Sequence, residues 1–140
     1  MYTERTTLSL QPSPKLTIIA IYRYHNTPIA DFYLQLKHIM HKHMIHPTVI
    51  LGDMNFNWFN TNESSPLRTL LNTWGYRQMI TTPTTKSDTL IDHIYTNIDP
   101  TQTITSTYNT YYSDHDIISM AINKHTCQQQ FQNRDQKYTQ

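Results

Sequence analysis

The sequence predicts an α/β domain, and three consecutive segments carry that prediction. Two runs of β-branched and other apolar residues, 16–22 and 48–53, predict buried strands. Between them lies a segment with apolar residues at helical spacing, so strand, helix and strand follow within about 40 residues. This order predicts a βαβ-like unit and leaves parallel and antiparallel pairing of the two strands open.

Both predicted helices have start and stop signals. The first has Thr27 as its N-cap and Pro28 at its first position, and Pro47 follows its end. The second begins with a cap at Ser65 before Pro66, and Gly75 supplies a left-handed stop. The apolar stripes consist of Ile29, Phe32, Tyr33, Leu36, Met40 and Met44 in the first helix and of Leu67, Leu70, Leu71 and Trp74 in the second.

The rest of the chain divides into short strands and polar ends. Strands are expected at 76–80, 90–95 and 117–122, with one more inside 97–112. Residues 1–15 are polar and contain two prolines, so we expect a leader without regular structure. The Gln-rich residues 124–140 predict a disordered tail, which leaves 16–123 as a single domain.

Composition excludes several classes of function. The formal net charge of +1 argues against a strongly basic nucleic-acid binder, although a local basic patch remains compatible with it. The single cysteine excludes an internal disulfide and a multi-cysteine zinc site. With two glycines in 140 residues, a glycine-rich phosphate loop cannot form. No apolar stretch approaches the roughly 18 residues of a membrane span, and no signal peptide is visible, so we expect an intracellular protein.

The most informative motif is Gly52-Asp53-Met54-Asn55, at the end of the second predicted strand. It places a carboxylate and a carboxamide at the carboxyl edge of a sheet, where α/β proteins bind their ligands. The alternative is an ordinary turn, because Asp and Asn are common turn formers.

Three further segments place polar side chains near strand ends. Tyr22 ends the first strand, Asp92 lies within a predicted strand, and Ser113-Asp114-His115 precedes the last strand. Tyr22 is also compatible with an interface tyrosine, and the last segment with a turn. Asp92 is harder to explain structurally, since aspartate is depleted in strands and costly to bury unpaired.

Taken together, these segments resemble the endonuclease/exonuclease/phosphatase superfamily, most of all the apurinic-type endonuclease domain of non-LTR retrotransposons. The resemblance covers 16–122 and rests on four motifs in the family's order: Tyr22-Arg23, Gly52-Asp53-Met54-Asn55, Ile91-Asp92-His93-Ile94-Tyr95 and Ser113-Asp114-His115. It implies a DNase I-like fold, a four-layer α/β sandwich of two similar halves. This chain would be the second half, an N-terminally truncated portion with one mostly antiparallel sheet and flanking helices.

The resemblance implies Mg²⁺-dependent hydrolysis of phosphodiester bonds in DNA, with Mn²⁺ as an alternative ion. Asp53 would orient and deprotonate the attacking water, and Asn55 would hold the scissile phosphate or the nucleophile. His115, oriented by Asp92, would bind a phosphate oxygen. Tyr22 would hydrogen-bond the phosphate or help to stabilise the leaving group. Such roles suit phosphoryl transfer, which needs in-line positioning and neutralisation of charge.

The metal site implied by the resemblance is incomplete. Asp114 would bind Mg²⁺ directly or through water, but the family's other principal ligand is a glutamate from the first half. The glutamates of this chain are Glu4 and Glu63, and neither is predicted to lie in a matching strand. We therefore expect weak or no activity from this fragment, and self-association through an uncovered sheet face.

Other functions remain open at this stage. One is a non-catalytic remnant that binds nucleic acid at most, and another is a phosphatase for small phosphoesters or lipids. If the chain is a retrotransposon product, we expect it to act on DNA in the nucleus. We expect no membrane as a partner. Four histidines, His38, His41, His43 and His46, form either a metal site or a polar helix end, and the lack of a neighbouring carboxylate or cysteine favours the helix end.

Overall fold

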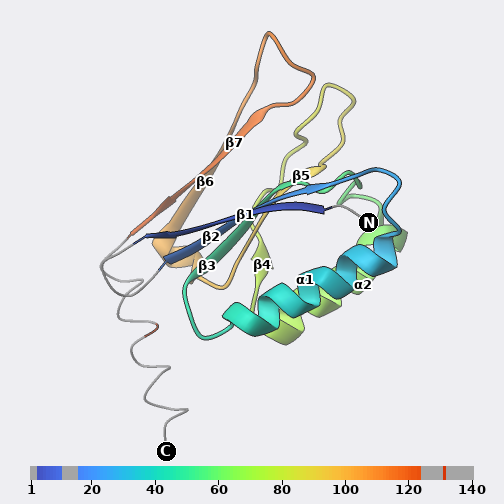
Figure 1. Ribbon diagram of the computed structural model, residues 1–140. Helices are drawn as coiled ribbons and strands as arrows, with labels where there is room; N and C mark the ends of the chain where they lie inside the picture. The colour runs from blue at the N-terminus through green and yellow to red at the C-terminus, as the bar shows by residue number, and fades with distance from the viewer. Residues whose placement is uncertain (1–2, 11–15, 124–130, 132–140) are drawn as a thin grey trace, which may run out of the picture.

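The computed structural model describes residues 3–10, 16–123 and 131, and its centre is a five-stranded mixed sheet (Figure 1). The strand order is β1-β2-β3-β5-β4. β2 and β3 pair in parallel, whereas the other neighbours are antiparallel. The strands are β1 (Thr3–Leu10), β2 (Leu16–Arg23), β3 (Thr48–Asp53), β4 (Arg77–Gln78) and β5 (Asp92–Thr96).

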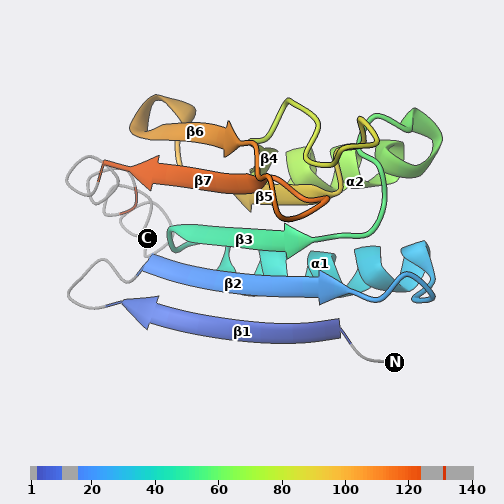
Figure 2. The ribbon, with the colours of Figure 1, turned by 90° about the horizontal axis from the view of Figure 1, so that it is seen from above.

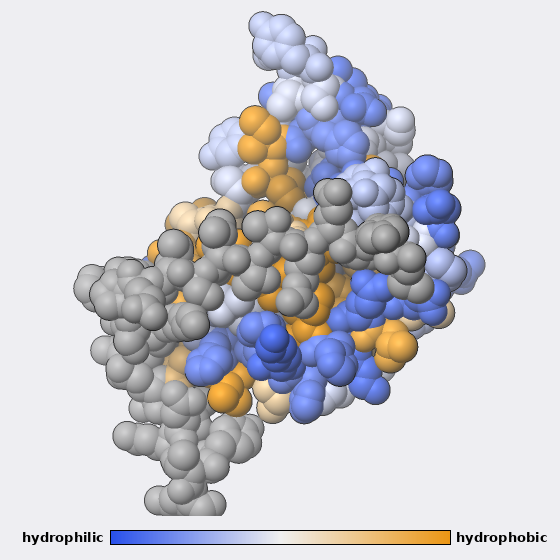
Figure 3. Space-filling view, viewed as in Figure 1, coloured by the Kyte–Doolittle hydropathy of each residue, from blue (hydrophilic) through white to orange (hydrophobic). Residues whose placement is uncertain are grey.

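Two helices cover one face of this sheet, and a two-stranded sheet lies on the other (Figure 1). The helices are α1 (Ile29–His43) and α2 (Thr61–Trp74), and the second sheet consists of β6 (Thr103–Tyr108) and β7 (Ile117–Ile122), preceded by the short 3-10 helix η1 (Pro100–Gln102). The helices bury one apolar cluster against the sheet, including Ile19, Phe32 and Ile50. A second cluster, including Val49, Leu90 and Ile94, lies between the two sheets with the inner side chains of β7. In Figure 3, hydrophobic residues reach the visible surface in the middle of the view, among hydrophilic ones.

The predicted α/β class is confirmed. The β2–α1–β3 unit is parallel, which the sequence left open. Two details differ from expectation. Residues 3–10 belong to the expected leader, yet they form β1, because their backbone pairs with β2 along its whole length and takes up the hydrogen bonds of that edge. The last two strands form a separate sheet instead of joining a single one.

The start of each helix also differs from the prediction. Pro28 occupies the N-cap of α1, and the Thr27 side chain makes no cap. α2 begins at Thr61, before the predicted cap at Ser65, so that Pro66 lies inside the helix. Because Asn62 and Pro66 are exposed, water can satisfy the Asn62 carbonyl that the proline leaves without a partner. Gly75 ends α2 in the left-handed conformation, as predicted.

The C-terminal segment contributes one described residue to the core. Phe131 is 2% exposed and packs in the cluster between the two sheets. The rest of the predicted tail lies outside the described residues. β6 and β7 leave β1 and β2 uncovered on this side of the sheet (Figure 2), where Ala20 is exposed. Self-association through this face stays a prediction.

Gly52 fixes how closely β2 and β3 approach each other at the end where the polar motif begins. It has a φ of 145° and lies opposite Ile21 on β2. A Cβ atom at this position would lie 1.8 Å from the Ile21 carbonyl oxygen. Only glycine therefore allows this pairing. The positions of Asp53 and Asn55, which follow in the chain, depend on it.

We expect Gly52→Ala to destabilise the fold by roughly 3 kcal/mol or more, because the added methyl group meets main-chain atoms and the backbone is strained. Urea unfolding measures this loss. Gly75→Ala is the matched control: it also has positive φ, at 71°, but nothing lies within 4 Å of an added Cβ. A loss at Gly52 no larger than that at Gly75 would contradict the close approach.

Candidate active site

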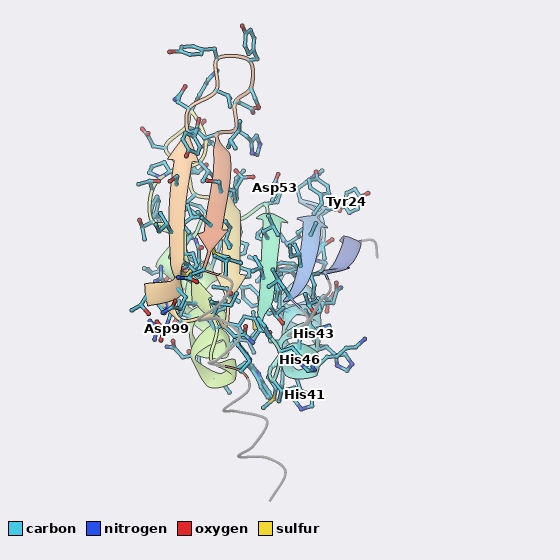
Figure 4. The ribbon with its side chains drawn as sticks, turned by 90° about the vertical axis from the view of Figure 1, so that its left-hand side faces the viewer. Tyr24, His41, His43, His46, Asp53 and Asp99 are labelled. Atoms are coloured by element: carbon cyan, nitrogen blue, oxygen red, sulfur yellow. The ribbon has the colours of Figure 1, made fainter. Side chains whose placement is uncertain are left out.

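Three predicted site residues lie in one row across the sheet. Tyr22 on β2 is the register partner of Asp53 on β3, and Asp53 is in turn the partner of Asp92 on β5. Residues opposite one another on neighbouring strands present their side chains on the same face. Figure 4 shows Asp53 at the end of its strand, at the same end of the sheet as Tyr24. The sheet register thus brings together groups that are 70 residues apart in the chain, from Tyr22 to Asp92.

His115 reaches this row from the loop between β6 and β7. Its Nδ1 lies 2.9 Å from Oδ2 and 3.2 Å from Oδ1 of Asp92. A bridge to Thr85 and a hydrogen bond from the Lys86 amide to the Asp114 carbonyl hold the loop in place. Asp92 is fixed as well, because its amide donates to the hydroxyl of the buried Thr84. The contact between Asp92 and His115 that the resemblance implied is present.

Asp53, Asp92 and His115 form a cluster with the composition of a metal site. Their ligand atoms all lie within 4.8 Å of one another, and each side chain is half-buried. Carboxylate oxygens are the ligands that Mg²⁺ and Mn²⁺ prefer. The two aspartates therefore fit such an ion, while the imidazole lies beside them.

Burial and the charges of neighbouring groups shift the pKa values of Asp53 and His115. Burial raises the pKa of Asp53, and the Asp92 charge raises it further, while the hydrogen bond from the Asn55 amide and the charges of His115 and Arg23 act in the opposite direction. Burial alone would lower the pKa of His115, but the hydrogen bond and charge of Asp92, together with Asp53 and Asp114, raise it above 6.5. Two carboxylates this close favour binding of a cation or a protonated imidazole.

A buried arginine holds the turn that carries Asn55. The Arg23 guanidinium donates to the carbonyls of Met54, at 3.2 Å, and Asn55, at 2.9 Å, as well as to Thr27. In return, the Asn55 amide group donates to the Arg23 carbonyl at 2.7 Å. Asn55 has a positive φ of 50° and its backbone N–H bonds Asp53. Asn tolerates this conformation better than most residues.

His93 supports the same strand from the opposite face. It is fully buried, and its ring packs against Phe56 and Trp58. Nε2 lies 3.0 Å from the Leu90 carbonyl, which only accepts, so Nε2 carries the proton and Nδ1 accepts from the Tyr95 hydroxyl. Burial lowers the pKa of His93 to about 4, against the effect of the Leu90 carbonyl. This histidine is neutral and structural, directly behind Asp92.

The other candidate residues lie around or away from the cluster. Asp114 is exposed and is not one of the three clustered residues. Glu4, which was not expected in a strand, lies in β1 as the register partner of Tyr22. Glu63 lies in the first turn of α2, on the helical side. Among the described residues, the histidines of α1 do not form a metal-ligand group. His41 instead packs against Trp74, with 4.9 Å between the ring centroids.

Sequence reasoning did not find Thr84 or Arg23 as supports of the site. Tyr22-Arg23 is one of the four motifs, but nothing in its sequence pattern shows that the Arg23 side chain is buried. Asp being rare in strands was the useful signal at Asp92. No comparable signal exists for a buried threonine in a loop rich in threonine.

Solved structures share this arrangement of strands and helices. No protein-family model matches the chain, and no curated protein matches it in sequence. The endonuclease domain of TRAS1, a telomere-specific non-LTR retrotransposon, superposes with a TM-score of 0.69 over 84% of this chain, at 16% identity. The chain shares the fold of that endonuclease domain.

Two bacterial toxins superpose over the same share of the chain. The cytolethal distending toxins of Actinobacillus actinomycetemcomitans and Haemophilus ducreyi give TM-scores of 0.59 and 0.52 at 13% and 12% identity. The chain spans 61% of the TRAS1 domain and 53% and 52% of the toxin chains. These likenesses confirm the predicted DNase I-like fold. In the described part of the chain, neither helix is long and apolar enough to cross a bilayer.

We expect the His115 ring to titrate above 6.5, because the nearby carboxylates favour its charged form. Histidine ring signals followed by NMR against pH give this pKa. Asp92→Asn removes the largest favourable interaction and should lower the pKa of His115. Asp31→Asn on α1 is the control and should leave it unchanged. Equal values in all three proteins would contradict the contact.

Stability should fall as the pH is lowered from 6.5 towards 4. In this window an unfolded His93 takes up a proton, whereas the buried ring, with its pKa lowered to about 4, does not. The difference corresponds to about 3 kcal/mol at full effect. Urea unfolding at several pH values tests this slope. His93→Gln keeps hydrogen-bonding groups but cannot titrate here, so its slope should be smaller; an unchanged slope would contradict the buried neutral state.

Proposed function

We propose that this protein is a metal-dependent phosphodiesterase that hydrolyses DNA. One observation carries the proposal: Asp53, the hydrogen-bonded pair Asp92–His115 and their ligand atoms converge within 4.8 Å at one end of the sheet. The likeness in fold to an endonuclease domain supports the choice of substrate. The proposed ion is Mg²⁺, with Mn²⁺ able to replace it.

The residues divide the chemistry between them. Asp53 is placed to orient a water molecule, and its raised pKa makes its carboxylate a better proton acceptor than an ordinary aspartate. Asp92 fixes the His115 ring through Nδ1, which leaves Nε2 to donate to a phosphate oxygen. Asn55 and Tyr22 flank Asp53 in the turn and on the next strand, where they would contact the phosphate. When bound by the aspartates, the cation would polarise the phosphate and neutralise its charge.

We expect this chain to cleave slowly. Asp53 and Asp92 are the two clustered carboxylates, and Asp114 is exposed beside them. Fewer fixed oxygen ligands bind a divalent ion more weakly. The proposed nuclear location follows from the proposed substrate.

Nicking of a supercoiled plasmid with Mg²⁺ or Mn²⁺, followed on agarose gels, tests the proposal. Chelation should abolish nicking, and Asp53→Asn or His115→Gln should each lower the rate by about 10²-fold or more. Asp31→Asn, on α1 and away from the cluster, is the matched control and should keep the wild-type rate.

Circular dichroism confirms that each variant is folded before the rates are compared. Nicking that survives chelation or Asp53→Asn would contradict the proposed mechanism. If the folded wild-type protein cleaves neither the plasmid nor a labelled single strand with either ion, a non-catalytic remnant is favoured instead.

A further inference from the structure

Exposed tyrosines lie on the loop that carries His115 and on the strand next to Asp53. Tyr111 and Tyr112, at the tip of the loop 109–116, are 90% exposed and fully exposed. Tyr108 is more than half exposed at the last position of β6, where this loop begins, and Tyr22 is partly exposed beside Asp53. Large apolar side chains are seldom displayed this fully without a partner when several gather in one place. Figure 1 shows the β6–β7 loop projecting beyond the rest of the molecule.

The projecting loop is tied to the site at its base. His115 donates its backbone N–H to the Ser113 hydroxyl at 3.0 Å, and the Thr110 hydroxyl donates to the His115 carbonyl at 2.6 Å. The bridge between Thr85 and His115 links the loop to the neighbouring loop. These bonds fix the foot of the loop, so Tyr111 and Tyr112 project from a segment whose foot carries the His115 imidazole.

The charges around the site do not favour a tight grip on many phosphates. The loops 24–28, 54–60, 79–91 and 109–116 contain one lysine, Lys86, and three aspartates, Asp88, Asp114 and Asp116, and no arginine. Arg23, at the end of β2, is buried and bound to carbonyl groups. Binding to duplex DNA through its backbone relies on several lysines and arginines that displace counterions. These loops lack such a set.

We propose that the exposed tyrosines form a stacking platform for the unpaired bases of a single-stranded nucleic acid. The proposal rests on the proposed function and names the form of substrate that the site receives. Rings stack on the faces of bases that are not already stacked in a duplex, and each contact contributes free energy without phosphate contacts. A strand lying across Tyr111 and Tyr112 would then place a phosphate near His115, at the foot of the same loop.

Fluorescence anisotropy with labelled oligonucleotides in the presence of a chelator measures binding without cleavage. The probes are a deoxythymidine strand of about 15 nucleotides, the matching uridine strand, and a duplex of the same length. We expect the wild-type protein to bind a single strand at least tenfold more tightly than the duplex. Its affinity should fall by less than about tenfold between 50 and 200 mM salt, because few counterions are released. The two single strands show whether DNA or RNA is preferred.

Substitutions at the tip separate the ring from the hydroxyl group. The double variant Tyr111→Ser, Tyr112→Ser should bind the single strand at least tenfold more weakly, and the corresponding Phe variant should bind like the wild type. Leu34→Ser is the matched control, since Leu34 is 67% exposed on α1, away from the site. Equal or tighter binding of the duplex, a loss of about a thousandfold with salt, or no effect of the Ser variant would overturn the proposal.

Asp53→Asn keeps this test separate from that of the proposed function. It should lose cleavage and retain binding of the single strand. Binding that depends on Tyr111 and Tyr112 in a protein that cleaves nothing would contradict the proposed function and leave the platform standing. If the protein cleaves, but neither its binding nor its cleavage changes when both tyrosines are replaced, the platform is contradicted and the proposed function stands.

Discussion

The parallel pairing of β2 with β3 is the constraint on which the site depends. It sets Tyr22 opposite Asp53, and the antiparallel pairing of β3 with β5 then sets Asp53 opposite Asp92. A shift of one residue in either pair would turn an aspartate to the helical face, among apolar side chains. Gly52 permits the pairing because any side chain at this place would collide with the Ile21 carbonyl.

The site has a supporting structure on each of its sides. Behind the sheet, Arg23 holds the turn with Asn55, and neutral His93 fills the space beneath Asp92. On the solvent side, the loop 109–116 brings His115 to Asp92. Arg23 donates to main-chain carbonyls, and His93 bonds the Leu90 carbonyl and the Tyr95 hydroxyl.

The two layers covering the sheet differ in extent. The helices bury one face along β2 and β3, whereas β6 and β7 cover the other face only in part (Figure 2). Phe131 fills some of the space between the sheets. His115 comes from the loop of this second layer and contacts Asp92, so the Asp53–Asp92–His115 cluster forms although the layer does not extend over β2.

The sequence by itself determined the two buried strands, both helices and the four polar motifs, because hydrophobic periodicity and rare residue types are local signals. It even indicated that Asp92 needs a partner. The family resemblance named His115 as that partner, and the two side chains are in contact. Only the tertiary structure decided that residues 3–10 pair with β2 and that Arg23 turns inward. Register and loop docking depend on contacts between distant residues, and no pattern within a short segment encodes them. The start of α2 before Pro66 also depends on tertiary structure. The Asn62 carbonyl is left without a helical hydrogen bond there, and its exposure to water makes this loss tolerable.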